Sequence, residues 1–346
     1  MRRWLDEIEQ ELYRLLPPQV DNGWVKQIFQ VTVPFEDDRL FETICEPGRD
    51  LLYRGGKRWR PMLLLLNAKM LGGTEAYRRA KELVGLVELP HNGSLIIDDI
   101  EDASVLRRGK PAAHVTYGTD ISINAGNLLY FLPTITIDNS GLPDSQKLRL
   151  YTIYSEYMRK IHLGQGMDIA WHHTIDLIPS VEAYELMCRM KTGCLAAMGA
   201  QIGAAVATED EQVVARAGLI AEHIGLSFQM FDDVINLEKG NPGKHRGDDI
   251  VENKKSLPII LYAQSRTANL ERMFEVFRHA HEHGYEASKD RIRSLIDEIE
   301  RSGALAQARD RALALARQVI DDIEELYEPS EDREVLTGMV KGFIEA

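Results

Sequence analysis

Residues 91–102 read HNGSLIIDDIED, in which an apolar stretch passes directly into a run of acidic side chains. Asp98 and Asp102 are four positions apart, so on a helix they share one face. Like charges at this spacing destabilise a helix, and the apolar neighbours Leu95 and Ile96 make the repulsion worse. A divalent cation would offset it, because Mg²⁺ usually takes one or two carboxylates while waters and substrate phosphates complete its octahedron. Taken alone, the stretch fits a magnesium site or a solvated acidic helix end.

A second acidic cluster favours the metal site. Residues 228–236 read FQMFDDVIN, so Asp232 and Asp233 also follow an apolar helical stretch, and Asp232 shares a helix face with Asn236. Two such helices facing one another in a bundle would place oxygen ligands on both sides of a cavity, which is where bundles commonly hold metals.

Basic residues accompany both clusters. The stretch GGKRWRP at 55–61 puts three cations beside a glycine pair, and Arg107 and Arg108 follow the first acidic cluster. Such runs are often solvated faces. Beside magnesium-binding carboxylates, however, cations neutralise diphosphate, and arginine forks bind it bidentately.

The rest of the chain predicts an all-α fold. Apolar residues recur at three- and four-residue spacing in most long segments, and no alternating run bounded by a tight-turn dipeptide indicates a strand. Because no stretch resembles a linker, we expect a single-domain helical bundle around a central apolar cavity over residues 36–346, with residues 1–35 as an N-terminal helical arm.

The composition argues against several other classes of protein. Lysine and arginine number 41 against 54 acidic residues, and the net charge of −13 argues against a nucleic-acid partner. The 3 cysteines are too few and too scattered for a disulfide framework or a zinc site. No apolar run approaches the ~18–20 residues of a membrane span, and the first residues lack a signal-peptide apolar segment. We therefore expect a cytoplasmic protein without a membrane span.

In this order, the motifs resemble those of trans-isoprenyl diphosphate synthases, the polyprenyl synthetase family. The resemblance covers residues 55–258 and comprises GGKRWRP at 55–61, DDxxD at 98–102, LRRG at 106–109, GQGMD at 164–168, KTG at 191–193, FQ at 228–229 and the block 243–258. A lone DDxxD is weak, but the ordered set is specific. The closest resemblance is to geranylgeranyl diphosphate synthases of the animal and fungal type, in which the second motif also ends in Asn. Trp59 stands where leucine is usual, and Asn253 stands where glycine is usual.

The resemblance implies a magnesium-dependent prenyltransferase that joins isopentenyl diphosphate head-to-tail to an allylic diphosphate, and that is usually a homodimer. Metals and cations would stabilise the charge that develops on the departing diphosphate. A closed apolar cavity would keep water away from the allylic cation.

Carried over residue by residue, the resemblance assigns a role to each motif position. The magnesium ligands are Asp98, Asp102 and Asp232; Asp99 and Asp233 support them, and Lys191 also takes part in catalysis. The allylic diphosphate is held by Arg107, Lys191, Thr192, Gln229, Lys244 and Lys254. Isopentenyl diphosphate is held by Lys57, Arg60, His91 and Arg108. Without the resemblance, His91 would be interpreted as a core histidine, and Gln165 and Asp168 fit either the site or an interior polar network.

Product length should depend on the depth of the cavity. Gly93 and Ser94 are small where farnesyl synthases often carry an aromatic residue, which would leave this point of the wall open. One helical turn is about 5.4 Å, roughly the reach of one isoprene unit. By the same resemblance Tyr130, Phe131 and His162 could form the floor, and ordinary aromatic packing is the alternative. We expect a geranylgeranyl (C20) product, with a longer polyprenyl chain as the alternative.

Two further alternatives are weaker. A class I terpene cyclase shares the fold and the first motif, but its usual metal triad ends in an acid where this chain has Gly240. A non-catalytic synthase subunit should have lost its metal acids, whereas Asp98, Asp102 and Asp232 are all present.

Overall fold

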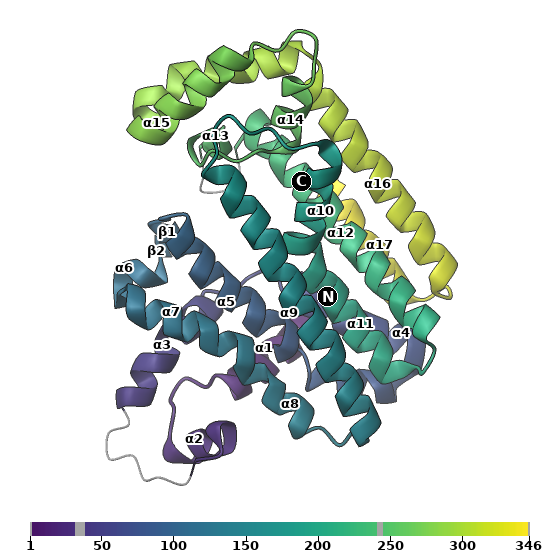
Figure 1. The fold of residues 1–346 in the computed structure, drawn as a ribbon. Helices are drawn as coiled ribbons and strands as arrows, with labels where there is room; N and C mark the ends of the chain where they lie inside the picture. The colour runs from purple at the N-terminus through teal and green to yellow at the C-terminus, as the bar shows by residue number, and fades with distance from the viewer. Residues whose placement is uncertain (1, 32–38, 241–244, 345–346) are drawn as a thin grey trace. The chain divides into compact units, whose positions relative to one another are not determined.

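The computed structural model describes residues 2–31, 39–240 and 245–344. These residues are helical almost throughout, which confirms the predicted all-α class (Figure 1). Within them, the one sheet is a two-stranded antiparallel ribbon of β1 (Leu106–Arg107) and β2 (Lys110–Pro111).

The helices follow one another along the chain with short connections. In order they are α1 (Arg2–Leu15), α2 (Asn22–Phe29), α3 (Arg39–Tyr53), α4 (Trp59–Lys81), α5 (Gly85–Glu101), α6 (Ala113–Tyr117), α7 (Thr119–Phe131), α8 (Ile135–Asp138), α9 (Asp144–His172), α10 (Val181–Cys188), α11 (Cys194–Ala207), α12 (Glu211–Glu238), α13 (Asp248–Val251), α14 (Leu257–Ala263), α15 (Leu270–Arg301), α16 (Ala304–Leu326) and α17 (Glu331–Ile344). A 3₁₀ turn covers Leu132–Thr134, and a π-helical turn covers Arg189–Gly193.

The chain folds into two compact units. One comprises Met1–Glu156 and Leu195–Gly218, and the other comprises Tyr157–Cys194 and Leu219–Ala346. Helices α9 and α12 contribute residues to both units. The first unit contains the basic stretch 55–61 and the first acidic motif, and the second contains Lys191 and the second acidic motif.

In the first unit, α5 is surrounded by other helices. It packs against α7, α3, α4 and α1. Helix α7 approaches α5 closely at Gly93, where a Cβ atom would lie 2.7 Å from the Gly126 carbonyl oxygen. Helix α1 reaches α5 with Leu15 and buries Ile8 and Leu12, so the residues predicted to form an arm contribute to the core of this unit.

In the second unit, the π-helical turn interrupts the path from α10 into α11. Such turns insert one extra residue into a helix and often occur at functional sites. This one carries Lys191 and Thr192. The far end of the unit is closed by α16 and α17, where Phe228 of α12 contacts Phe343 with ring centroids 5.0 Å apart.

No helix within the described ranges is both long enough and apolar enough to cross a membrane.

Candidate active site

The first acidic motif lies at the C-terminal end of α5. The amide of Asp102 donates to the Asp98 carbonyl oxygen at 2.8 Å, so helical spacing continues to the end of the motif. Asp98 and Asp102 therefore share a face, as predicted. His91 lies seven positions before Asp98, two turns along the same face. One face of a single helix thus carries two of the three predicted metal ligands and one predicted isopentenyl diphosphate ligand.

Asp99 points about 100° away from Asp98 and is 1% exposed. Its carboxylate accepts two bonds from Arg107, at 2.9 Å from Nε and 2.5 Å from Nη2 to Oδ1. Burial raises the pKa of Asp99, although Arg107 opposes that shift. The same guanidinium lies 3.5 Å from Asp98 Oδ2. Asp99 therefore anchors the β1 strand that carries Arg107 and holds this cation beside Asp98, a predicted metal ligand.

The second acidic motif divides its two acids in the same way. Asp232 is partly exposed, whereas Asp233 is buried and accepts from the Tyr184 hydroxyl at 2.6 Å, Gln229 Nε2 at 3.0 Å and the Leu257 amide at 2.9 Å. Burial raises the pKa of Asp233 to about 6, against the effect of these bonds. Asp233 thus ties α12 to α10 and to the start of α14.

Asn236 does not act as the neutral oxygen donor that the sequence suggested. It is fully buried, and its side-chain oxygen accepts from the Asp249 amide at 3.4 Å. Although it stands one turn after Asp232, its position inside the unit makes it an anchor for α13 instead of a metal ligand.

Lys191 lies in the π-helical turn and pairs with Asp168 at 2.6 Å. His172 also contacts Asp168, at 3.0 Å. Burial opposes ionisation of Asp168, but Lys191 and His172 outweigh it and hold its pKa well below the usual range. The Thr192 hydroxyl donates to Gln229 Oε1 at 3.0 Å. Of the predicted allylic-site residues in the second unit, Lys191 is thus paired with Asp168, and Thr192 is bonded to Gln229, whose side-chain nitrogen donates to Asp233.

The block 243–258 is described only in part. Lys244 lies outside the described residues. Lys254 pairs with Glu252. Asn253 has a φ of 55°, in the left-handed region that glycine favours and asparagine tolerates better than most residues, which explains why asparagine can replace the family's usual glycine. Its amide nitrogen donates to the His172 carbonyl oxygen, and its side-chain oxygen accepts from Lys255 at 2.6 Å.

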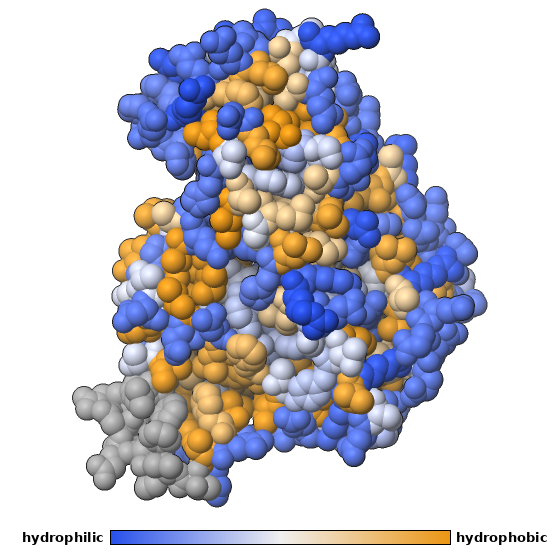
Figure 2. Space-filling model, in the orientation of Figure 1, coloured by the Kyte–Doolittle hydropathy of each residue, from blue (hydrophilic) through white to orange (hydrophobic). Residues whose placement is uncertain are grey.

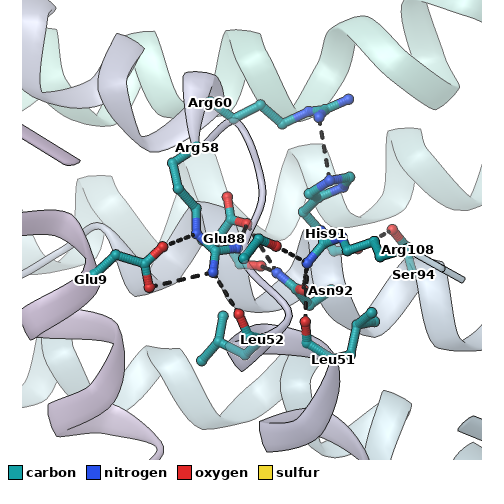
Figure 3. A network of polar contacts seen from close by, with 11 residues as sticks. Glu9, Leu51, Leu52, Arg58, Arg60, Glu88, His91, Asn92, Ser94 and Arg108 are labelled. Carbon is teal, nitrogen blue, oxygen red and sulfur yellow. Dashed lines mark hydrogen bonds and ion pairs between the residues drawn. The ribbon is translucent and has the colours of Figure 1, made fainter. Parts of the chain in front are cut away.

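Three of the four predicted isopentenyl diphosphate ligands, Arg60, His91 and Arg108, lie near one another in the first unit (Figure 3). Arg60 Nη1 lies 3.4 Å from His91 Nε2, and its guanidinium stacks 4.5 Å above the Trp59 ring, a contact that the usual leucine could not make. Burial and the nearby arginines hold the pKa of His91 well below its usual range, so the ring is neutral. Arg108 donates to the Leu51 carbonyl oxygen at 3.0 Å.

Lys57 is exposed on the turn before α4. Arg60, His91 and Arg108 are only partly exposed. The three form a partly enclosed group that carries positive charge, and the exposed amine of Lys57 comes from the turn that leads into α4.

The predicted chain-length residues separate into two groups. Gly93 does not leave an opening, because α7 occupies the space that a side chain would take, with Tyr130 Cε1 at 3.2 Å from a Cβ atom built there. Ser94 is partly exposed and donates to the His91 carbonyl oxygen at 2.9 Å. Tyr130 is partly buried, and its carbonyl oxygen accepts from Tyr154 at 2.5 Å.

The other two expected floor residues are exposed. Phe131 is 71% exposed in the chain, so its ring does not close a cavity within it. His162 is exposed in the second unit, with Nδ1 2.7 Å from the Met158 carbonyl oxygen. Of the three aromatic residues expected at the floor, only Tyr130 faces the helix packing around α5.

Four residues near the predicted cations were not predicted as part of the site (Figure 3). They are Glu9, Arg58, Glu88 and Asn92. Arg58 stands within the basic motif, and Glu88 and Asn92 flank His91. Their burial could not be inferred from these positions. Glu9 gave no signal, because its partner is 49 positions away.

The donors suit a hard divalent cation. Asp98, Asp102 and Asp232 offer carboxylate oxygens, and magnesium-type sites need only one or two of these besides substrate phosphates. Within the ranges that the structure describes, no three His, Cys, Asp or Glu side chains form a metal site by themselves. In each unit the predicted ligands are partly exposed carboxylates.

Comparison with known proteins agrees with the fold and the motifs. The polyprenyl synthetase family model matches residues 41–299. A geranylfarnesyl diphosphate synthase of Aeropyrum pernix is 34% identical over 304 residues, covering 85% of this chain and 92% of that protein. A geranylgeranyl pyrophosphate synthase of Gibberella zeae is 36% identical over 188 residues, covering 54% of this chain and 48% of that protein. The crystal structure of a geranylgeranyl pyrophosphate synthetase from Pyrococcus horikoshii superposes with a TM-score of 0.85 at 25% identity, covering 99% of this chain and 96% of that one.

The fold and these similarities define a trans-prenyltransferase of isoprenoid biosynthesis that works head-to-tail on prenyl diphosphates. The chain belongs to the polyprenyl synthetase family, whose members typically use a divalent metal. The expected restriction to the animal and fungal type is not supported, because archaeal as well as fungal synthases are among the similar proteins.

Proposed function

We propose that this protein condenses isopentenyl diphosphate with an allylic diphosphate to make geranylgeranyl diphosphate, using Mg²⁺. The observation that carries the proposal is the single face of α5. It presents His91, next to Arg60, and then Asp98 and Asp102, two and three turns further along. A neutral imidazole, which can donate one N–H, and cations for one diphosphate therefore precede carboxylates that would hold the metal of the second diphosphate.

Different side chains would bind the metal and each of the two diphosphates. Asp98, Asp102 and Asp232 would hold magnesium, which when bound stabilises the charge developing on the departing diphosphate. Arg107, fixed by Asp99, would bind the allylic diphosphate beside these carboxylates, as would Lys191, Thr192, Gln229, Lys244 and Lys254. Lys57, Arg60 and Arg108 would bind isopentenyl diphosphate, and His91, held neutral, would donate a hydrogen bond from its ring N–H to a diphosphate oxygen.

The residues near Tyr130 would limit the length of the product. The similar proteins include one named for a C25 product and others named for C20 products. Gly93 is filled by α7, so Ser94, Tyr130 and Tyr154 are the residues of this unit that would limit the chain. The presence of two tyrosines here, joined by the bond from the Tyr154 hydroxyl to the Tyr130 carbonyl oxygen, supports the shorter, C20 product over C25.

A homodimer is the proposed assembly. The first unit exposes large apolar side chains on α6 and α7, including Val115 at 52%, Ile123 at 41% and Phe131 at 71%. Apolar side chains gather over β1, α6 and α7 in Figure 2. Contiguous exposed apolar surface commonly marks an interface, and a second copy would cover it.

The decisive experiment is incubation with labelled isopentenyl diphosphate, magnesium and each of the C5, C10 and C15 allylic primers, followed by chain-length analysis of the dephosphorylated products. A dominant C20 alcohol is expected. A C25 or longer product would keep the chemistry and discard the C20 assignment. Cyclic hydrocarbons from a preformed diphosphate, without elongation, would refute the proposed condensation.

A further inference from the structure

Arg58 is a fully buried cation between two carboxylates from different helices. Its Nε lies 2.7 Å from Glu9 of α1, its Nη1 lies 2.6 Å from Glu88 of α5, and its Nη2 donates to the Leu52 carbonyl oxygen at 2.6 Å (Figure 3). The Arg58 side chain is 0% exposed and that of Glu88 is 3% exposed. A buried guanidinium is stable only when its charge is neutralised and its N–H groups have acceptors. Here each of the three nitrogens of Arg58 has an acceptor.

These contacts hold an unusual backbone. Arg58 has a φ of 48°, in the left-handed region that side chains other than glycine, asparagine and aspartate rarely adopt. It stands at the N-terminus of α4, directly after Lys57 and two positions before Arg60. The fixed Arg58 side chain therefore sets the direction of both expected isopentenyl diphosphate ligands.

The same contacts reach Arg108 through α5. Glu88 Oε1 accepts from Asn92 Nδ2 at 3.0 Å, and Arg108 Nη1 lies 3.5 Å from Asn92 Oδ1. A Cβ atom at Gly56 would lie 3.3 Å from both Arg58 Nη1 and Arg108 Nη2, so the glycine backbone lies close against both guanidinium groups. Because like charges repel, Glu9 and Glu88 are needed to keep Arg58 beside Arg108.

We propose that Arg58, clamped by Glu9 and Glu88, is a positioning residue for isopentenyl diphosphate, and that helix α1 is thereby part of the substrate-binding machinery. The inference rests on the proposed function, because it assumes that Lys57, Arg60 and Arg108 bind this substrate. The Arg58 side chain is buried and would not contact the substrate. It would act on substrate binding only by positioning these neighbours.

The test compares Glu9→Gln and Arg58→Lys with the wild-type protein. Lysine keeps the charge of Arg58 but cannot make a fork to Glu9, Glu88 and Leu52 together. Both variants should raise the KM for isopentenyl diphosphate about tenfold or more, since small displacements of binding groups have large effects. The KM for the allylic primer and kcat at saturating substrate should stay within about twofold of wild type.

Glu7→Gln is the matched control. Glu7 also ties α1 to α4, through the Tyr77 hydroxyl, but it does not contact Arg58. If α1 served only stability, Glu7→Gln and Glu9→Gln would lower Tm alike and leave both KM values unchanged, and that result would overturn the inference. A lower KM for isopentenyl diphosphate in Glu9→Gln would also overturn it, because this would indicate a charge effect and not positioning.

Calorimetric titration of isopentenyl diphosphate separates this inference from the proposed function. If wild type binds the compound and Glu9→Gln binds it about tenfold more weakly, the positioning role stands even where turnover is low. If wild type neither binds nor elongates, the proposed function fails, and the positioning role fails with it. Should Arg58→Lys fold poorly, the Glu9→Gln result decides the inference.

Discussion

At the scale of single residues, each acidic motif pairs one partly exposed carboxylate with one buried carboxylate. Asp98 is partly exposed, with 20% of its side chain accessible, whereas the Asp99 side chain is 2% exposed and held by Arg107. Asp232 and Asp233 repeat the arrangement in the second unit. Adjacent positions on a helix point about 100° apart, so one residue can face the site while its neighbour anchors a second element.

This difference predicts opposite results for two isosteric substitutions. Asp98→Asn should lower kcat by about 100-fold or more, because it removes a metal-facing charge, while stability changes little. Asp99→Asn should cost about 3 kcal/mol of stability, because Arg107 loses its buried partner. Steady-state kinetics and urea unfolding of both variants measure this. Equal stability losses in the two variants would contradict the division of roles.

Because Lys255 is buried, we expect the free energy of unfolding to depend on pH. Burial lowers its pKa to about 8. Below pH 8 the folded and unfolded chains both carry the proton, so the cost of burying the charge is fully present. Between about pH 8 and 10.5 only the unfolded chain binds the proton, and the free energy of unfolding should rise with pH. The rise should disappear in Lys255→Met and persist in Lys289→Met, which alters an exposed lysine. Urea unfolding across this pH range would detect it.

At the scale of elements, the crossing of α5 and α7 decides what Gly93 does. Small residues before an acidic motif can leave a cavity open or let another helix approach, and the sequence is the same in both cases. Here a Cβ atom at Gly93 would lie 2.7 Å from the Gly126 carbonyl oxygen and 3.0 Å from the Leu129 Cβ atom. Backbone atoms cannot move aside as the end of a flexible side chain can, so the glycine is required for packing.

Gly93→Ala should therefore destabilise the protein by about 1–3 kcal/mol through overpacking, without lengthening or shortening the product. Ser94→Phe is the comparison, since Ser94 is partly exposed one position further along α5. It should shorten the product by narrowing the space beside the acidic face. Thermal unfolding and product analysis of both variants test this pair. A shorter product from a fully stable Gly93→Ala would restore the original interpretation of Gly93.

At the scale of the whole molecule, we expect Tyr130 to contribute to the floor of the substrate cavity and Phe131 to contribute to the homodimer interface. Tyr130 packs toward Gly93 and lies next to Tyr154, whereas Phe131 is exposed. Tyr130→Ala should lengthen the product by one isoprene unit, because it removes a ring from the proposed floor. Phe131→Glu should weaken the homodimer, because it places a charge in the proposed apolar interface.

Product chromatography and light scattering at several protein concentrations measure the two effects. Tyr130→Ala should leave the mass in solution unchanged, which makes each variant the control for the other. If Phe131→Ala changed product length while Tyr130→Ala did not, the floor would have to be moved to Phe131.

The class of this protein could be predicted from its sequence alone. Apolar spacing predicted the helices, and the order of the acidic and basic motifs predicted the family. It also placed Asp98 and Asp102 on one face, because helical periodicity is local and does not depend on distant residues. Likewise, the separate roles of Asp98 and Asp99 follow from adjacent positions on a helix once one face is known to be buried.

The burial of the polar residues, and the partners that they contact, could be known only from the folded chain. Asn236 was expected to face a metal, but its oxygen accepts from Asp249 inside the second unit. Gly93 was expected to open a cavity, but α7 fills the position. Glu9 gave no signal, although it neutralises Arg58 across 49 positions of sequence. Each outcome depends on which side chains meet after packing, and a local pattern contains no information about partners that are distant in the chain.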